Sequence, residues 1–171
     1  MNTQKNKHNY ADYKIEEAYF ELLTLKQNNA ITITDIVKKA EVSRASFYRN
    51  FHDKEDILKN YLKCLIYEIQ EIVICKKTSK EKCEDILFVV RDERERIAVL
   101  LKQGYGTEIL YLVNDLSLKF VDTYSIKQSM NQVYAIVGLM FNVIVEWVLN
   151  GCRSDISDVV DAIMWAFYTE E

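Results

Sequence analysis

The side chains that could do chemistry gather in one short stretch of the sequence, residues 31–58. Polar and small side chains stand there almost consecutively, at Ser43, Arg44, Ala45, Ser46, Tyr48, Arg49 and Asn50. Arginine can donate to guanine O6 and N7, and hydroxyl and amide groups can reach phosphates or base edges. Small side chains let a helix come close to the bases. The stretch therefore predicts a recognition helix that enters the major groove of duplex DNA.

Helical patterns precede this stretch and would position it. A first helix is predicted to end near Asn28 or Asn29, from the helical spacing of Ile15, Ala18, Tyr19, Leu22 and Leu23. Thr32 or Thr34 can cap a second helix of about two turns, because a threonine hydroxyl accepts from a free backbone N–H at a helix start. The inner face of that helix would consist of Ile36, Val37 and Ala40.

The third helix is the predicted recognition helix. Ser43 is expected to cap it, and it runs to about Asn50 or Phe51. Phe47 and Phe51 lie one helical turn apart, so both rings would point inward and leave the polar residues outside. Asp53 would then cap a fourth, longer helix that begins with Lys54 and links two parts of the chain.

The remaining sequence keeps the helical rhythm. Helices are predicted over about 80–90, 94–103 and 107–123, with a turn at Gly104 to Gly106. Ser125 is expected to cap a long apolar helix that ends near Asn150 and Gly151, and a last helix runs from about Asp155 or Ser157 to Thr169. The chain contains no proline. We therefore expect an all-α protein, with a three-helix DNA-binding domain over residues 10–52 and a helical effector-binding and dimerisation domain over residues 53–171.

The charge balance excludes a protein that coats nucleic acid by bulk electrostatics. The net charge is −4. Residues 1–60 contain ten Lys and Arg against nine Asp and Glu, whereas residues 61–171 contain twelve against seventeen. Nonspecific nucleic-acid binders usually carry a strong positive excess. This difference fits an N-terminal part that tolerates phosphates and a C-terminal part that does not, and ordinary surface variation would explain it equally well.

Other classes of protein lack support in the sequence. The four cysteines form no CxxC pair and no cluster with histidine at metal spacing, so free thiols and no metal or cofactor are expected. No phosphate-binding glycine loop, HExxH or GxSxG motif is present, which argues against an enzyme. No secretory signal opens the chain, so the cytoplasm is the expected location. Residues 133–149 are apolar but shorter than the roughly 20 residues of a membrane span, and include Glu146.

The stretch around the third helix resembles the DNA-binding domain of the TetR family of transcriptional regulators. The matching residues are Thr32, Ile36, Ala40, Val42, Ser43, Phe47, Tyr48, Phe51, Lys54, Glu55 and Leu58. The resemblance covers residues 14–58 and implies a homodimer that binds a palindromic double-stranded DNA operator. It implies that the major-groove face consists of Arg44, Ala45, Ser46 and Tyr48. It gives mainly backbone contacts to Thr32, Thr34, Arg49, Asn50 and Lys54, while Ser43 can reach a phosphate or a base edge.

Two residues depart from the family pattern, because Glu41 and Ala45 stand where the family usually has glycine. An acidic side chain facing a phosphate is unfavourable, so Glu41 is expected to point away from DNA. Ala45 adds only a methyl group, which could contact a thymine methyl. Neither departure is expected to remove the fold.

The end of the chain resembles the C-terminal domain of the family subset that regulates dihydroxyacetone kinase genes. Trp147 and Gly151 carry this resemblance. It implies a dimer interface on the last two helices, formed by Val133, Val137, Met140, Phe141, Ile144, Val148, Val159, Ile163 and Phe167. The apolar excess of residues 133–149 independently favours such a partner.

A small-molecule effector is the remaining expected partner, and the sequence leaves its existence open. Residues that could line an effector pocket are Phe88, Tyr105, Tyr111, Asn142, Glu146 and Trp147; plain core packing is the alternative for each. Repression is the family's commoner outcome. The alternatives are an activator of the same family, or a helical protein-interaction module that does not bind DNA.

Overall fold

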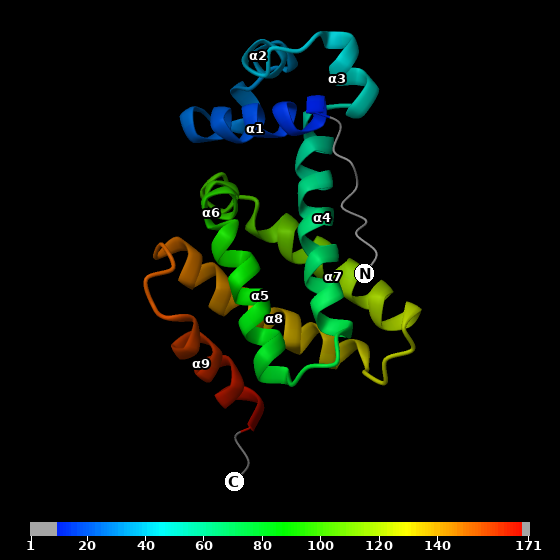
Figure 1. Cartoon of the computed structure of the whole chain (residues 1–171), viewed down its shortest axis with the longest axis vertical. Helices are drawn as coiled ribbons and strands as arrows, with labels where there is room; N and C mark the ends of the chain where they lie inside the picture. The colour runs from blue at the N-terminus through cyan, green and yellow to red at the C-terminus, as the bar shows by residue number, and fades with distance from the viewer. Residues whose placement is uncertain (1–9, 169–171) are drawn as a thin grey trace. The chain divides into compact units, whose positions relative to one another are not determined.

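The computed structural model describes residues 10–168, and this part of the chain contains helices and no strand (Figure 1). The first elements are α1 (Tyr10–Leu25), the short 3₁₀ helix η1 (Asn28–Ala30), α2 (Ile33–Lys39), α3 (Arg44–Asn50) and α4 (Lys54–Ile74). The others are α5 (Ser79–Asp92), α6 (Arg94–Lys102), α7 (Gly106–Thr123), α8 (Met130–Leu149) and α9 (Ile156–Tyr168). The predicted all-α class is confirmed.

The structure divides into two compact units, and the division falls within α4, between Cys64 and Leu65. The sequence-based division between residues 52 and 53 lies earlier, at the start of α4. The first part of α4 joins the N-terminal unit because Ile57, Leu58 and Tyr61 are buried. The assignment of DNA binding to one domain and of effector binding and dimerisation to the other stays a prediction.

Aromatic and branched side chains form the core of the N-terminal unit. Tyr19 and Phe47 are fully buried, as expected from their spacing, and Phe51 is 4% exposed. Phe20 of α1 packs edge-on against Tyr61 of α4, with 4.8 Å between the ring centroids. Aromatic pairs of this kind add to the stabilisation from burial alone. This core leaves the opposite side of α3 in solvent.

The expected caps of the early helices are present. Thr32, and not Thr34, caps α2, and its hydroxyl accepts from the backbone N–H of Asp35. Ser43 caps α3 in the same way. The Asp53 carboxylate accepts from the backbone N–H of Asp56 at the start of α4. Each cap satisfies an N–H that the helix itself leaves without an acceptor.

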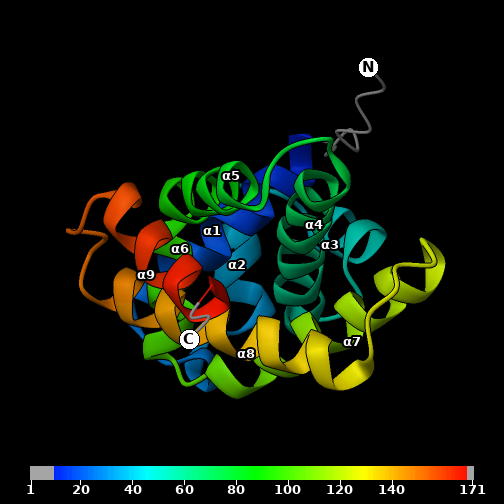
Figure 2. The same ribbon diagram turned by 90° about the horizontal axis from the view of Figure 1, so that it is seen from below.

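The C-terminal unit has its core between α5, α8 and α9. Leu87, Val148, Val160 and Ile163 are at most 2% exposed there. Figure 2 shows α8 extending from α7 to α9. Gly151, with φ of +74°, follows the end of α8, in agreement with the predicted left-handed stop.

The expected cap of α8 was wrong. Ser129, not Ser125, caps this helix, and the side chain of Gln132 accepts from the Ser129 backbone N–H in return. Ser125 instead has φ of +50° in the connection after α7. Both serines stand before the apolar run with a glutamine three residues on, Gln128 and Gln132, so the capping-box pattern fits both, and it is the fold that forms the reciprocal pair at Ser129.

Candidate nucleic-acid interface

The outer side of α3 carries the predicted DNA-contacting residues. Arg44, Ala45, Tyr48 and Arg49 are exposed there, whereas Ser46 and Asn50 are half-buried. Tyr48 is 56% exposed although it contacts the buried ring of Phe47 edge-on. The helix therefore presents a narrow face with two guanidinium groups, one phenol and one methyl group. Their contacts with DNA stay a prediction.

Two further predicted contacts make hydrogen bonds within α3. The Ser43 hydroxyl oxygen accepts from the Ser46 backbone N–H at 3.0 Å, which leaves its own hydrogen available to an outside acceptor. The Asn50 side-chain amide donates to the Ser46 carbonyl at 3.0 Å. Ser43 thus combines the cap with an exposed donor, whereas Asn50 is turned back toward its own helix.

Arg44 connects α3 to α2. Its guanidinium Nη2 donates to the hydroxyl oxygen of Thr34. Both residues were predicted to contact DNA, but the sequence did not indicate that they contact each other. A guanidinium group has further N–H donors, so this bond orients Arg44 and still leaves donors for a base.

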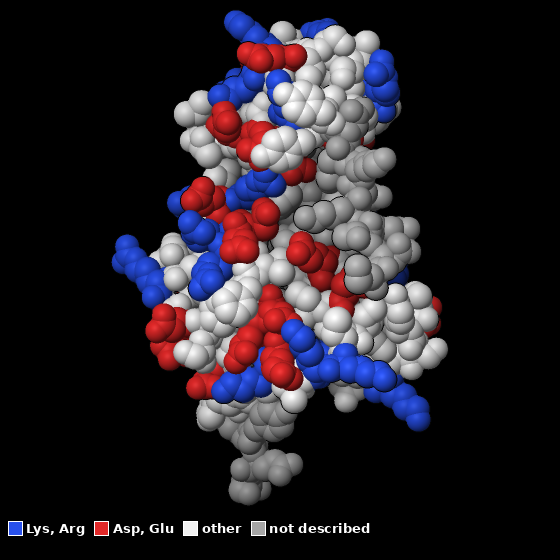
Figure 3. Space-filling model, viewed as in Figure 1, with Lys and Arg blue, Asp and Glu red and all other residues white. Residues whose placement is uncertain are grey.

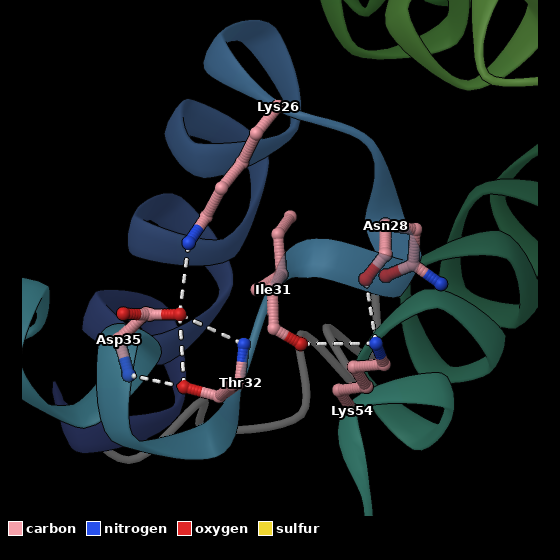
Figure 4. A network of polar contacts seen from close by, with 6 residues as sticks. All are labelled: Lys26, Asn28, Ile31, Thr32, Asp35 and Lys54. Atoms are coloured by element: carbon pink, nitrogen blue, oxygen red, sulfur yellow. Dashed lines mark hydrogen bonds and ion pairs between the residues drawn. The ribbon is translucent and has the colours of Figure 1, made fainter.

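A network of polar contacts surrounds the start of α2 (Figure 4). The Asp35 carboxylate accepts from the Lys26 ammonium at 2.8 Å, from the Thr32 backbone N–H at 2.9 Å and from the Thr32 hydroxyl at 2.8 Å. These bonds, Lys26 first, hold the pKa of Asp35 well below its usual range. The Thr32 hydroxyl is both donor and acceptor within this network.

Lys54 was predicted to bind a phosphate, and its ammonium group is engaged within the protein. Nζ donates to the carbonyl of Asn28 at 2.6 Å and to the carbonyl of Ile31 at 3.0 Å (Figure 4). Both carbonyls belong to the segment between α1 and α2. Sequence reasoning missed this contact, and a lysine at the first position of a helix was its only signal, because a cation is unfavourable there.

The turn between α2 and α3 contains Glu41 with φ of +55°. This conformation favours glycine, which explains why the family usually has glycine at the position. The Glu41 carboxylate is exposed, and one of its oxygens lies 3.8 Å from the Lys14 ammonium of α1. The acidic side chain is therefore directed toward α1.

Basic side chains accompany the polar face of α3. Lys38 and Lys39 lie in the last turn of α2, and Arg49 lies in the last turn of α3. Lys39 forms an ion pair with Glu21 of α1. Figure 3 shows basic groups over α2 and α3 with acidic groups nearby, and mixed signs elsewhere on that view. The positive charge is thus confined to a few side chains near α3, in agreement with the nearly equal numbers of basic and acidic residues in residues 1–60.

Within residues 10–168, no group of three or more His, Cys, Asp and Glu side chains could hold a metal ion. The four cysteines are free, and Cys83 is buried. Burial raises the pKa of the Cys83 thiol to about 11. Burial also raises the pKa of Cys64 and of Cys152. These three thiols therefore favour the neutral form.

The predicted dimer residues separate into two groups. Four of them are buried in the C-terminal unit itself: Val133, Val148, Val159 and Ile163. Four others are half-buried on α8: Val137, Met140, Phe141 and Ile144. The side chain of Phe167 lies outside the described part of the chain. Trp165 of α9, which the sequence did not single out, is 71% exposed.

The predicted effector-pocket residues differ in their surroundings, and their role in binding an effector stays a prediction. Phe88 and Tyr111 are exposed, Tyr105 is half-buried, and the buried Trp147 donates to the Ser154 carbonyl. Two hollows in the described part of the chain are lined by other residues. The larger, about 480 Å³, lies at the connection of α7 and α8 and includes Lys127 and Met130.

The exposed side chains of the other two predicted pocket residues bond within α8. The Asn142 amide donates to the Gly138 carbonyl, and Glu146 accepts from the Asn150 amide. Among the described residues, α8 is the one helix whose length and apolar composition would allow it to cross a membrane. The core helix of a soluble protein passes the same test.

Comparison with known families places the N-terminal unit. Residues 17–61 match the sequence model described as bacterial regulatory proteins, tetR family. A curated relative, the uncharacterized HTH-type transcriptional regulator YxbF of Bacillus subtilis (strain 168), is 27% identical over 101 residues, which are 58% of this chain. The match covers 25% of that relative, so this chain spans about a quarter of its length.

Solved structures share the fold over most of the chain. A TetR-family regulator from Syntrophomonas wolfei is 20% identical, with a TM-score of 0.70, over 92% of either chain. The dihydroxyacetone kinase operon activator DhaS is 14% identical, with a TM-score of 0.58, over 90% of this chain and 92% of its own. The fold is that of the family, with an N-terminal helix-turn-helix and a C-terminal helical domain. These proteins are named as regulators and not as enzymes, in agreement with the prediction that this chain is not an enzyme.

Proposed function

We propose, from the premise that this chain belongs to the tetR family of bacterial regulatory proteins through residues 17–61, that it is a transcriptional regulator whose α3 reads an operator in the major groove. The observation that supports this proposal best is the exposed face of α3. Arg44, Tyr48 and Arg49 lie in solvent there, while Phe47 on the opposite side is fully buried. The recognition helix of a helix-turn-helix needs this arrangement.

The residues that we propose for DNA contact have distinct tasks. Arg44 and Tyr48 contact base edges, and Ala45 and Ser46 keep the approach close. Arg49 contacts a phosphate, because its charge is exposed at the end of α3 and has no ion-pair partner among the described residues. The Ser43 hydroxyl and the Thr34 hydroxyl donate to the DNA backbone.

A homodimer would place two α3 helices on the two halves of a palindromic operator. In support, α8 is strongly apolar, yet only 22% of the residues in its most apolar 18-residue stretch are buried in the single chain. Such a face usually has a partner. We assign the interface to the half-buried residues of α8, with Val137 and Phe141 at its centre, because these two do not pack against the described core of their own chain, and to the exposed Trp165 of α9.

The proposal extends to repression through occlusion of a promoter, with activation as the alternative. A small molecule bound in the C-terminal unit would shift the population between DNA-competent and incompetent spacings of the two α3 helices. The name of DhaS, an operon activator, is the observation that keeps the activator alternative. A reporter gene under the identified operator distinguishes the two outcomes.

Operator binding is the direct test. Fragments of genomic DNA that the protein retains are sequenced, and affinity for the recovered site is measured by fluorescence anisotropy. Arg44→Ala and Tyr48→Ala should each weaken binding by about 1–3 kcal/mol per lost base contact. Tyr67→Ala is the matched control, because Tyr67 on α4 is as exposed as Tyr48, at 56%. Unchanged affinity in both α3 variants would refute the assigned face, and no retained site would refute DNA reading.

The dimer is tested separately. Phe141→Glu and Trp165→Glu should each shift the protein toward the monomer in light scattering at micromolar concentration, because each buries a charge in the interface. Tyr13→Glu, on the exposed side of α1, should leave the mass unchanged. A wild-type protein that is monomeric throughout would contradict the homodimer.

A further inference from the structure

We propose that Lys54 is a positioning residue for the recognition helix and not a phosphate ligand. Its ammonium group would hold the backbone that leads into α2, and through α2 the placement of Arg44. This inference rests on the proposed function, since it concerns how the DNA-reading face is oriented. It departs from the role that the family resemblance implies for this lysine.

The first support is the geometry of the two hydrogen bonds. Lys54 Nζ donates to the Asn28 carbonyl at 2.6 Å and to the Ile31 carbonyl at 3.0 Å. Ile31 precedes Lys54 by 23 residues, so the bond joins segments that are distant in the sequence. Ile31 is 2% exposed, and among the described residues no other group donates to its carbonyl. A move of the ammonium group to a phosphate would leave this buried acceptor without a partner, which is unfavourable.

The second support is electrostatic. Lys54 is the first residue of α4, where the helix dipole disfavours a cation. The Asn28 carbonyl, in the single turn of η1, also accepts from the Ile31 backbone N–H, and the Ile31 carbonyl directly follows the end of η1, where the negative partial charge of the turn attracts a cation. The two carbonyls therefore offset the unfavourable position of the Lys54 charge at the start of α4, and no DNA phosphate is needed for this.

The same short segment is held from a second side. The buried Tyr19 hydroxyl donates to the Asn28 side-chain oxygen at 3.1 Å. Asn28 is thus bound by α1 through its side chain and by α4 through its carbonyl. The segment has little freedom while both contacts persist, and loss of the Lys54 contact releases one of them.

A continuous set of contacts connects this segment to α3. Ile31 precedes Thr32, whose hydroxyl caps α2. In the first turn of α2, Thr34 accepts the hydrogen bond from Arg44. A displacement of the backbone at Ile31 would therefore change the first turn of α2 and, with it, the acceptor that orients Arg44. Hydrogen bonds and adjoining backbone therefore connect Lys54 to Arg44 without a gap.

The test compares Lys54→Met with Lys59→Met. Lys59 lies further along α4, is exposed, and has no polar partner among the described residues, so its variant removes the same charge without the contact. Operator affinity is measured over a series of salt concentrations. Lys54→Met should weaken binding about 2- to 30-fold with an unchanged slope of log affinity against log salt, and Lys59→Met should change neither. A slope lower by about one would mean a lost phosphate contact and would overturn the proposal.

Hydrogen exchange of the free protein supplies a readout independent of DNA. Amides of residues 28–35 should exchange faster in Lys54→Met than in the wild type and in Lys59→Met; equal exchange would also overturn the proposal. If Lys54→Met does not fold, Lys54→Gln replaces it in both measurements: its amide has no charge and donates more weakly than the ammonium group, so the same changes in affinity and exchange are expected at a smaller size, again with an unchanged salt slope. A wild type that binds no operator would refute the proposed function, while the exchange result would still decide the positioning role.

Discussion

Arg44, the first residue of α3, donates a hydrogen bond to the hydroxyl of Thr34 in α2. The two residues are ten positions apart and belong to different helices. A flexible arginine is thereby placed before any DNA arrives, which lowers the entropy cost of ordering it in the complex. In the proposed DNA-reading face, the bond gives Thr34 a role through Arg44, in addition to the backbone contact proposed for its own hydroxyl.

Replacing Thr34 with valine should therefore weaken specific operator binding. Valine keeps the shape but removes the acceptor, so Arg44 loses its orientation. In a double-mutant cycle of Thr34→Val and Arg44→Ala, measured by anisotropy on the operator, we expect a coupling of about 0.5–1.5 kcal/mol. Thr24→Val on α1, where the hydroxyl bonds only within its own helix, is the control. Additive effects would mean that Thr34 does not act through Arg44.

Stability in acid should depend on Asp35. The contacts with Lys26 and Thr32 lower the pKa of Asp35 in the folded protein, so its contribution to stability is present above the unfolded pKa near 3.8. That contribution is lost as the pH falls through the folded pKa. Thermal unfolding followed by circular dichroism from pH 7 to pH 2 should show a smaller acid-induced loss in Asp35→Asn than in the wild type. Asp115→Asn, outside any helix cap, should keep the wild-type dependence.

In alkali, the buried thiol of Cys83 should reduce stability. Its pKa is raised by burial from 9.0 to about 11, so the unfolded thiol ionises first as the pH rises. The contribution of Cys83 to the free energy of unfolding is therefore fully present below pH 9. The free energy of unfolding should fall by up to about 2 kcal/mol between pH 9 and 11. Urea titrations should give a shallower alkaline slope for Cys83→Ala than for the wild type. The exposed Cys75, replaced with alanine, provides the comparison, and equal slopes in all three proteins would contradict the assignment.

The turn at Glu41 should be stabilised by glycine. The φ of +55° costs a residue with a Cβ about 1–2 kcal/mol, and glycine in turn costs roughly 0.5–1 kcal/mol of chain entropy. Glu41→Gly should thus raise the free energy of unfolding by up to about 1 kcal/mol in urea. The exposed contact with Lys14 offsets little of this gain. Glu41→Ala removes the same carboxylate but keeps the Cβ, so a gain there instead would point to charge and not to backbone strain.

Local features of this protein were readable from the sequence. Helical spacing placed Phe47 and Phe51 inside and Tyr48 outside, because burial of one face depends on residues only one turn apart. Ser43 and Asp53 were recognised as caps for the same reason, since each accepts from a backbone N–H three positions on. Gly151 ended α8 as expected, because few other residues adopt its φ. The prediction of the α8 cap was wrong, because two serines, Ser125 and Ser129, stand in the same short connection and both can cap a helix.

Tertiary structure alone decided which surfaces and donors are available. The apolar stripes of α8 and α9 were predictable, but not that Val148, Val159 and Ile163 pack against α5 in their own chain, because a stripe does not name its partner. The same limit holds for Lys54 and Arg44. A lysine or arginine has the same ionic chemistry in any sequence, whereas its acceptor depends on how distant segments are folded together. The sequence therefore determined the helices and the polar face of α3, and the fold decided which acceptors the Arg44 and Lys54 side chains bond within the protein.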